Sequence, residues 1–425
     1  MRQLSQGSRG PAVELLQLAL VRWGTEALAA DGIFGPETVQ ALRRFQRGMG
    51  LLPDGIAGRN THRALLPWYT GYILHRIQRG DTLYAIAQKH GSSIEAIELA
   101  NPGTEPGSLN VGASLIVPLG FNVVPTDISY SSAIVGYCVR GLAARYPFLS
   151  VGEIGKSVMG RPLWRLSLGS GKRPVLYNAS HHANEWITTP VLLKFAEELS
   201  RAFATGRKLC GYTAAEILSR AAIHLVPALN PDGIDLVTGE LQGGEFYRQA
   251  KNIAANYPQF PFPSGWKANI RGTDLNLQYP ADWEQAKQNK YALGIRSPAP
   301  ADYVGAYPLS APEARAMHDY TLALSPALIL AYHTQGEVIY WQYKDYEPPR
   351  SRAIGEALSA ASGYPLETTP FASGFAGYKD WFIERFFRPG YTIEAGQGIN
   401  PLPLGQFDEI YKDNLGILVS AAMMA

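Results

Sequence analysis

Apolar residues recur at helical spacing in the first part of the chain. One set runs from Val13 to Leu20, and another lines one side of the segment from Val39 to Gln46. Because apolar residues three or four positions apart share one side of a helix, both segments are predicted to be helical. Each is followed by an Asp-Gly turn, which favours a backbone with positive φ. We therefore expect a small helical bundle over residues 1–68.

The two turns belong to an internal repeat. The octapeptide DGIFGPET at 31–38 returns as DGIAGRNT at 54–61, and Pro36 suits the first position of a helix. This repeat resembles that of the three-helix peptidoglycan-binding domain, a resemblance that implies binding to the bacterial cell wall. An unrelated helical domain is the alternative.

A strand–helix–helix–strand order is predicted for residues 72–119. Two apolar strands enclose two short helices, whose N-caps are expected to be Asp81 and Ser93. This order, with the GDTL tetrapeptide at 80–83, resembles a LysM module. The resemblance implies binding of glycans that contain N-acetylglucosamine, and an unrelated small α+β domain is the alternative.

Buried strands alternate with helices in the third segment, residues 130–425, which follows a linker that begins at Leu119. Continuous apolar runs predict strands that are buried on both faces, at 175–177, 223–226 and 328–332. Helical stretches at 190–204 and 311–324 alternate with them. We therefore expect an α/β domain with a mostly parallel mixed sheet and helices on both faces.

Composition narrows the possible partners and compartments. A formal net charge of +2 argues against a dedicated nucleic-acid binder, and no apolar run is long enough for a transmembrane helix. Cys138 and Cys210 cannot form a disulfide framework and are interpreted as bystanders. The polar N-terminus has no visible signal peptide, so another export route, a removed signal, or action inside a cell or spore stay open.

Three strand ends carry residues suited to a catalytic metal. His182 and Glu185 follow the strand that ends at Tyr177, and their spacing of three puts them on one face of a helical turn. His333 and Glu394 each follow a further apolar run. Two histidines and one glutamate, with an open position for water, are a known ligand set for catalytic zinc. Each signal is weak alone, but together they favour a zinc site.

The motifs around these residues are similar to those of the metallocarboxypeptidases. HANEW at 182–186 is similar to the family's first zinc motif, while NPDG at 230–233 and GTDLN at 272–276 match two further segments. The motifs occur in family order across the whole third segment. The resemblance implies the carboxypeptidase-like fold and zinc-dependent peptide hydrolysis.

The resemblance also implies roles for individual residues. One Zn²⁺ per chain would be bound by His182, Glu185 and His333, and Glu394 would take a proton from water and pass it to the leaving amine. An arginine near the zinc would stabilise the developing oxyanion, and Arg271 is the candidate.

Three positions depart from the family's pattern. The first zinc motif usually carries an arginine where Asn184 stands. After Asn276 the family normally has an arginine that grips the substrate's C-terminal carboxylate, and here that residue is Leu277. Losing such a clamp costs several kcal/mol of carboxylate recognition, so strict carboxypeptidase action is disfavoured. Asn276 is still expected to hold a polar group of the substrate. Ala372 stands at the position of the family's catalytic tyrosine.

Lys379 falls near the position that sets side-chain preference in the family. A lysine there would favour an anionic group on the substrate, such as the second carboxylate of meso-diaminopimelate, and the alternative is a solvated lysine beside Asp380.

The whole pattern resembles the γ-D-glutamyl-diamino acid endopeptidases of sporulating bacteria, which cut peptidoglycan stem peptides. We therefore expect a wall-associated enzyme, acting outside the cell or in a spore compartment, with peptidoglycan glycan and stem peptides as partners. A monomer is favoured. The alternatives are a zinc carboxypeptidase acting on protein or peptide C-termini, and a non-catalytic wall-binding protein.

Overall fold

The chain divides into two compact units in a computed structural model, which describes residues 2–25, 28–105 and 107–425. The first unit is Met1–Ser150 and the second is Val151–Ala425. No described helix is both long and apolar enough to cross a membrane.

The first unit opens with the predicted helices, α1 (Pro11–Trp23), α2 (Pro36–Gly48) and α3 (Arg59–Thr70). A buried glutamine closes each copy of the repeat. Gln17 Nε2 donates to the Asp31 carboxylate at 2.8 Å, and its Oε1 accepts from the backbone N–H of Gly32 at 2.9 Å. Gln46 makes the same two contacts, at the same distances, with Asp54 and Gly55. The two copies of the repeat therefore share their hydrogen bonds as well as their sequence pattern.

A strand–helix–helix–strand module follows in the predicted order. Strands β1 (Tyr72–Arg76) and β2 (Ser114–Pro118) pair antiparallel, and α4 (Leu83–His90) and α5 (Ile94–Ala100) lie between them in sequence. Ser93 caps α5 as predicted. The prediction for Asp81 is wrong, because Thr82 is the N-cap of α4. The Asp81 carboxylate instead accepts the backbone N–H of Gln78 and lies 2.8 Å from His75, which holds it back towards β1.

Helix α6 (Ser132–Arg145) packs on α3, β1 and β2 within the first unit. Its approach to α3 requires a glycine, because a Cβ added at Gly141 would lie 2.0 Å from the carbonyl oxygen of Thr70.

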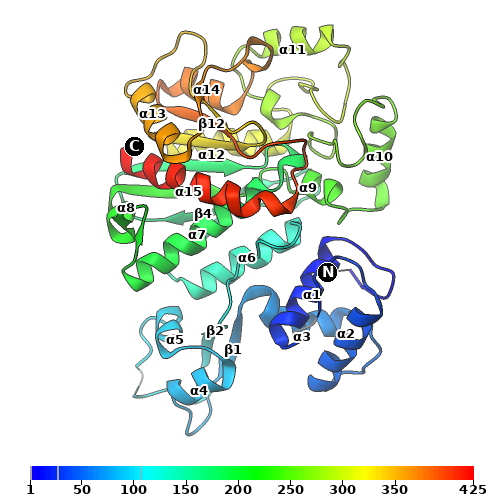
Figure 1. Ribbon diagram of the computed structural model, residues 1–425, viewed down its shortest axis with the longest axis vertical. Helices are drawn as coiled ribbons and strands as arrows, with labels where there is room; N and C mark the ends of the chain where they lie inside the picture. Colours follow the sequence, from blue (N-terminus) through cyan, green and yellow to red (C-terminus); the bar gives the residue numbers. More distant parts are fainter. Residues whose placement is uncertain (1, 26–27, 106) are drawn as a thin grey trace. The chain divides into compact units, whose positions relative to one another are not determined.

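The second unit is built on an eight-stranded mixed sheet, drawn with its surrounding helices in Figure 1. Its strand order is β11-β10-β12-β9-β5-β8-β4-β3. The four adjacent strands from β12 to β8 are parallel, whereas β4 and β10 pair antiparallel with β8 and β12. The strands are β3 (Ser150–Lys156), β4 (Pro162–Leu168), β5 (Arg173–Ala179), β8 (Ala221–Val226), β9 (Leu328–His333), β10 (Val338–Tyr340), β11 (Leu366–Glu367) and β12 (Gly390–Glu394). A separate hairpin is formed by β6 (Lys208–Leu209) and β7 (Tyr212–Thr213).

Helices cover both faces of this sheet, as predicted. In β5, Tyr177 contacts Phe195 of α7 and donates to the Leu418 carbonyl of α15, whereas Leu176 shares a core with Met317 of α12 and Phe382 of α14. Successive residues of a strand point to opposite faces, so both faces are buried and the apolar runs need no polar alternation. The helices are α7 (Thr188–Thr205), α8 (Ala214–Arg220), α9 (Pro231–Val237), α10 (Gly244–Ala254), α11 (Trp283–Ala292), α12 (Pro312–Leu324), α13 (Ser351–Ser362), α14 (Tyr378–Phe386) and α15 (Phe407–Met424).

Candidate metal centre and active site

The carboxyl ends of β5, β9 and β12 bring the predicted metal ligands and base together. His333 ends β9 and is paired in register with Glu394, which ends β12. His182 lies in the turn after β5, and Glu185 ends the short 3₁₀ helix η1 (Ala183–Glu185) that follows it. Because parallel strands end at one edge of a sheet, residues far apart in sequence meet there.

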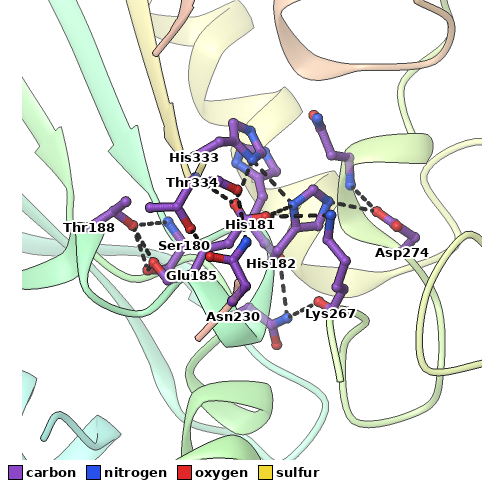
Figure 2. Close-up of polar contacts among 12 residues, drawn as sticks. Ser180, His181, His182, Glu185, Thr188, Asn230, Lys267, Asp274, His333 and Thr334 are labelled. Atoms are coloured by element: carbon purple, nitrogen blue, oxygen red, sulfur yellow. Dashed lines mark hydrogen bonds and ion pairs between the residues drawn. The ribbon is translucent and has the colours of Figure 1, made fainter. Parts of the chain in front are cut away.

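Hydrogen bonds hold the turn after β5 in place (Figure 2). The hydroxyl of Thr188 donates to the carbonyl of Glu185 at 2.7 Å and accepts from the backbone N–H of Ser180 at 3.2 Å. Asn230 donates to the carbonyls of His181 and Ala268 at 3.1 and 3.0 Å, which joins this turn to a second loop. Asn230, the first residue of the NPDG segment, therefore stabilises the turn that carries the candidate ligands.

The three predicted ligands form a compact group of nitrogen and oxygen donors. Nδ1 of His182 lies 2.9 Å from one Glu185 carboxylate oxygen, and Nδ1 of His333 lies 2.9 Å from the other. The two Nδ1 atoms are 3.2 Å apart, and one donor atom from each residue lies within 4.8 Å of the others. All three side chains are buried. Two imidazoles and a carboxylate converging on one point match the donor set of a catalytic zinc site.

The charge of the surrounding cavity also fits a divalent cation. The cavity measures about 340 Å³ and contains the ligand group in its wall. Its described lining includes five carboxylates, Glu185, Asp274, Asp302, Asp380 and Glu394, and three ammonium groups, Lys267, Lys290 and Lys379. The carboxylates exceed the ammonium groups by two, and with both histidines neutral, as metal ligands are, an ion of charge +2 would balance that excess.

Asp274 orients the first histidine from behind. Its Oδ1 lies 3.1 Å from Nε2 of His182, on the far side of the ring from Glu185. Such outer carboxylates fix the orientation of metal-binding histidines. Burial alone would lower the pKa of His182, but Glu185 and Asp274 raise it to about 9. Burial also opposes ionisation of Asp274, yet His182 and Lys267 hold its pKa well below the usual range.

A lysine lies where an arginine was expected. Lys267 lines the cavity with its Nζ 3.4 Å from Glu185, and although burial opposes its charge, Glu185 and Asp274 raise its pKa. Arg271 is exposed and is not among the described residues that line the cavity. Its backbone N–H bonds Asn269 at 3.1 Å, and the chain turns at Gly272, so its side chain is left in solvent. The structure therefore does not support the expectation for Arg271.

Lys267 carried no distinguishing signal in the sequence. It follows Trp266, which is fully buried and donates from its indole to the Asn269 carbonyl at 3.1 Å. This contact fixes the loop so that Lys267 points into the cavity. The sequence does not show the contact, because it forms only when the loop is folded.

Glu394 stands at the cavity wall as expected for a general base. Burial raises the pKa of its carboxyl above the ordinary value, against the lowering effect of His333. A carboxylate with a raised pKa is a stronger base, which suits proton transfer near neutral pH.

The predicted substrate-contacting residues also line the cavity. Asn276 accepts the backbone N–H of Tyr378 at 3.0 Å, which orients its amide, and Leu277 lies beside it as an apolar part of the wall. Lys379 is not solvated, because it is buried and ion-paired with Asp380. Tyr340 also lines the cavity, although the sequence did not single it out.

His181 lies next to the ligand group without joining it. Its Nε2 is 3.0 Å from the hydroxyl of Tyr279, and its ring stacks on that of His333. The structure thus agrees with a neighbouring role for this residue.

The chain is similar to known proteins in all three of its segments. The zinc carboxypeptidase family matches residues 137–415, a peptidoglycan binding domain matches 9–65 and a LysM domain matches 75–118. Gamma-D-glutamyl-L-diamino acid endopeptidase 1 of Lysinibacillus sphaericus is 41% identical over 303 residues, covering 71% of this chain and 74% of that protein. YqgT, an uncharacterized protein of Bacillus subtilis, is 36% identical over 338 residues, or 79% of this chain and 86% of its own.

The fold is shared with solved carboxypeptidases. The carboxypeptidase A of Helicoverpa armigera aligns with a TM-score of 0.53 at 17% identity, covering 100% of this chain and 97% of its own. Together with the family match over most of the chain and the buried His–Glu–His group, these likenesses show that the chain belongs to the zinc carboxypeptidase family and is a zinc metallopeptidase.

Proposed function

We propose that this enzyme hydrolyses the bond between γ-D-glutamate and the diamino acid of peptidoglycan stem peptides. The observation that carries this proposal is Leu277 on the cavity wall, where carboxypeptidases hold the arginine that grips a C-terminal carboxylate. An apolar side chain there offers no bidentate partner for that carboxylate. The relative from Lysinibacillus sphaericus, named as an endopeptidase for γ-D-glutamyl-diamino acid bonds, supports the same choice.

We assign one Zn²⁺ to His182, Glu185 and His333. When bound, zinc supplies a Lewis acid that activates water and polarises the scissile carbonyl. Glu394 takes the proton from water and passes it to the leaving amine. Lys267, in place of Arg271, sets a positive charge where the carbonyl oxygen gains negative charge.

The two N-terminal modules would hold the enzyme on its substrate. We assign residues 1–68 and 72–119 to wall binding and residues 130–425 to catalysis. Tethering to the glycan raises the effective concentration of stem peptides without any change in the active site. This arrangement suits a monomer that works at the wall, outside the cell or in a spore compartment.

Mass spectrometry of L-Ala-γ-D-Glu-meso-diaminopimelate after incubation with the enzyme tests the proposal. We expect release of L-Ala-D-Glu and free diaminopimelate, and loss of that release when a zinc chelator is present. The Glu394→Gln variant controls for contaminating peptidases. If the zinc-loaded enzyme leaves this peptide intact but cleaves blocked dipeptides with ordinary C-termini, the enzyme is a carboxypeptidase and the proposal is wrong.

A further inference from the structure

A lysine and an aspartate that are adjacent in sequence share the cavity wall away from the metal ligands. Lys379 and Asp380 lie in the first turn of α14, and their side chains are 4% and 3% exposed. Nζ of the lysine lies 2.7 Å from Oδ1 of the aspartate, and both residues line the cavity.

Helix geometry alone does not explain this contact. Residues adjacent on a helix point about 100° apart, so their charged ends meet only when both side chains bend into the same space. A lysine in the first turn also faces the positive end of the helix dipole, and lysine is rarely buried. Folding of α14 therefore favours neither the position nor the burial of Lys379, which points to a role in the cavity.

The pair also keeps unused bonding capacity. Lys379 donates one hydrogen bond, to the Gln342 carbonyl at 2.6 Å, although an ammonium group carries three donors. Asp380 Oδ1 has no aligned hydrogen-bond donor among the described residues, despite its closeness to the ammonium. Space for this carboxylate depends on Gly377, since a Cβ added there would lie 2.9 Å from Asp380 Oδ2.

A ligand that carries an ammonium and a carboxylate on one carbon could form the missing hydrogen bonds of both Lys379 and Asp380. Its carboxylate would bond Lys379 and its ammonium would bond Asp380, so the pair and the bound zwitterion together would carry no net charge. A side chain ending in an ammonium alone would face Lys379 as a like charge. A side chain ending in a carboxylate alone would face Asp380 in the same way.

We propose that Lys379 and Asp380 together select a diamino acid whose side chain ends in a zwitterion, as that of meso-diaminopimelate does. The inference rests on the proposed function, because it concerns the residue on the leaving side of the same bond. It adds Asp380, which reads the distal ammonium, to the anion selection expected of Lys379 alone.

Three soluble peptides of the form L-Ala-γ-D-Glu-X test the inference with the full-length, zinc-loaded enzyme. X is meso-diaminopimelate, L-lysine, which lacks the distal carboxylate, or L-2-aminopimelate, which lacks the distal ammonium. We expect kcat/KM for meso-diaminopimelate to exceed each of the others by about tenfold to hundredfold, the effect of one charged hydrogen bond.

Two single variants separate the two charges. Lys379→Met should erase most of the preference over the lysine peptide, and Asp380→Asn should erase most of the preference over the aminopimelate peptide. Because each single variant strands a buried charge, the double variant Lys379→Met/Asp380→Asn is made as well, and it should lose both preferences. Lys290→Met removes another ammonium of the same wall and should keep the order of the three substrates.

The outcomes distinguish this inference from the proposed function. Cleavage of all three peptides at similar kcat/KM by the unmodified enzyme overturns the inference and leaves the proposed function intact. Variants of the pair that slow all three substrates by one common factor also overturn it, because a purely structural pair would do so. Failure to cleave any of the three overturns the proposed function itself.

Discussion

At the scale of single residues, the proposed mechanism assigns zinc binding and proton transfer to different side chains. The possible ligand atoms of His182, Glu185 and His333 converge on one point. Glu394 lines the same cavity but does not belong to that group. A change at Glu394 should therefore affect chemistry alone.

The Glu394→Gln variant tests this separation. The amide has nearly the same shape as the carboxylate but accepts no proton, so we expect kcat to fall by about 10²- to 10⁴-fold. Zinc content, measured by elemental analysis, should stay near one ion per chain. Glu185→Gln is the contrast, since it should lose zinc. Loss of zinc from the Glu394 variant would place that residue among the ligands instead.

The assignment of Lys267 has a matched control in the same loop. Lys267→Met should lower kcat by about 10²-fold, because a charge near the developing oxyanion is lost. Arg271→Met removes an exposed cation four residues away and should change kcat by less than about twofold. Steady-state rates on one soluble peptide measure both. The reverse order of effects would restore Arg271 to the site.

At the scale of elements, a buried carboxyl ties helix α12 to the loop that carries Lys267. Glu313 accepts the backbone N–H of Val158 at 3.0 Å and the side-chain amide of Asn269 at 3.1 Å. Asn269 in turn accepts the backbone N–H groups of Arg271 and Thr273, each at 3.1 Å. The shape of the loop therefore depends on a contact with a distant helix.

This contact makes stability depend on pH. Burial raises the pKa of Glu313 to about 7, against the hydrogen bonds that lower it. A group whose pKa is higher in the folded state stabilises it at low pH, and that stabilisation disappears as pH rises through about 7. Glu313→Gln cannot titrate, so the stability advantage of the wild type over it should shrink between pH 5 and pH 8, by at most about 3 kcal/mol.

Thermal unfolding of both zinc-loaded proteins at the two pH values measures this difference. Other titrating groups are common to both proteins and cancel in the comparison. If the difference in Tm between the two proteins were the same at both pH values, the pKa of Glu313 would not differ between the folded and unfolded states.

At the scale of the whole molecule, wall binding and catalysis should respond to different competitors. A LysM module binds glycans that contain N-acetylglucosamine, and its tether matters only when the stem peptide is attached to such a glycan. We expect an excess of a soluble N-acetylglucosamine oligomer to slow the digestion of intact peptidoglycan several-fold, while cleavage of a soluble tripeptide stays unchanged. Release of products from each substrate, followed by chromatography, measures this. Equal inhibition of both reactions would mean that the oligomer binds the active site.

The sequence by itself determined what depends on local pattern. Helical periodicity predicted α1, α2 and α12, and apolar runs predicted β5, β8 and β9. The order of the motifs predicted three metal ligands and a base, and the fold brings these four residues to one cavity. These features were readable because neighbouring residues decide whether a segment forms a helix or a strand, and because strand ends meet at one edge of a parallel sheet.

Only the tertiary structure decided which charges enter the cavity. Lys267 points inward and Arg271 outward because their loop is held by two contacts with distant segments, from Asn230 to Ala268 and from Asn269 to Glu313. Within the loop, the indole of Trp266 donates to the carbonyl of Asn269. Thr82, and not Asp81, is the N-cap of α4, because the carboxylate of Asp81 lies against His75 of β1. Lys379 and Asp380 form a pair only because both bend into one cavity. In each case the direction of a polar side chain depends on partners that folding brings close. The spacing of residues along the chain does not reveal which partners these are.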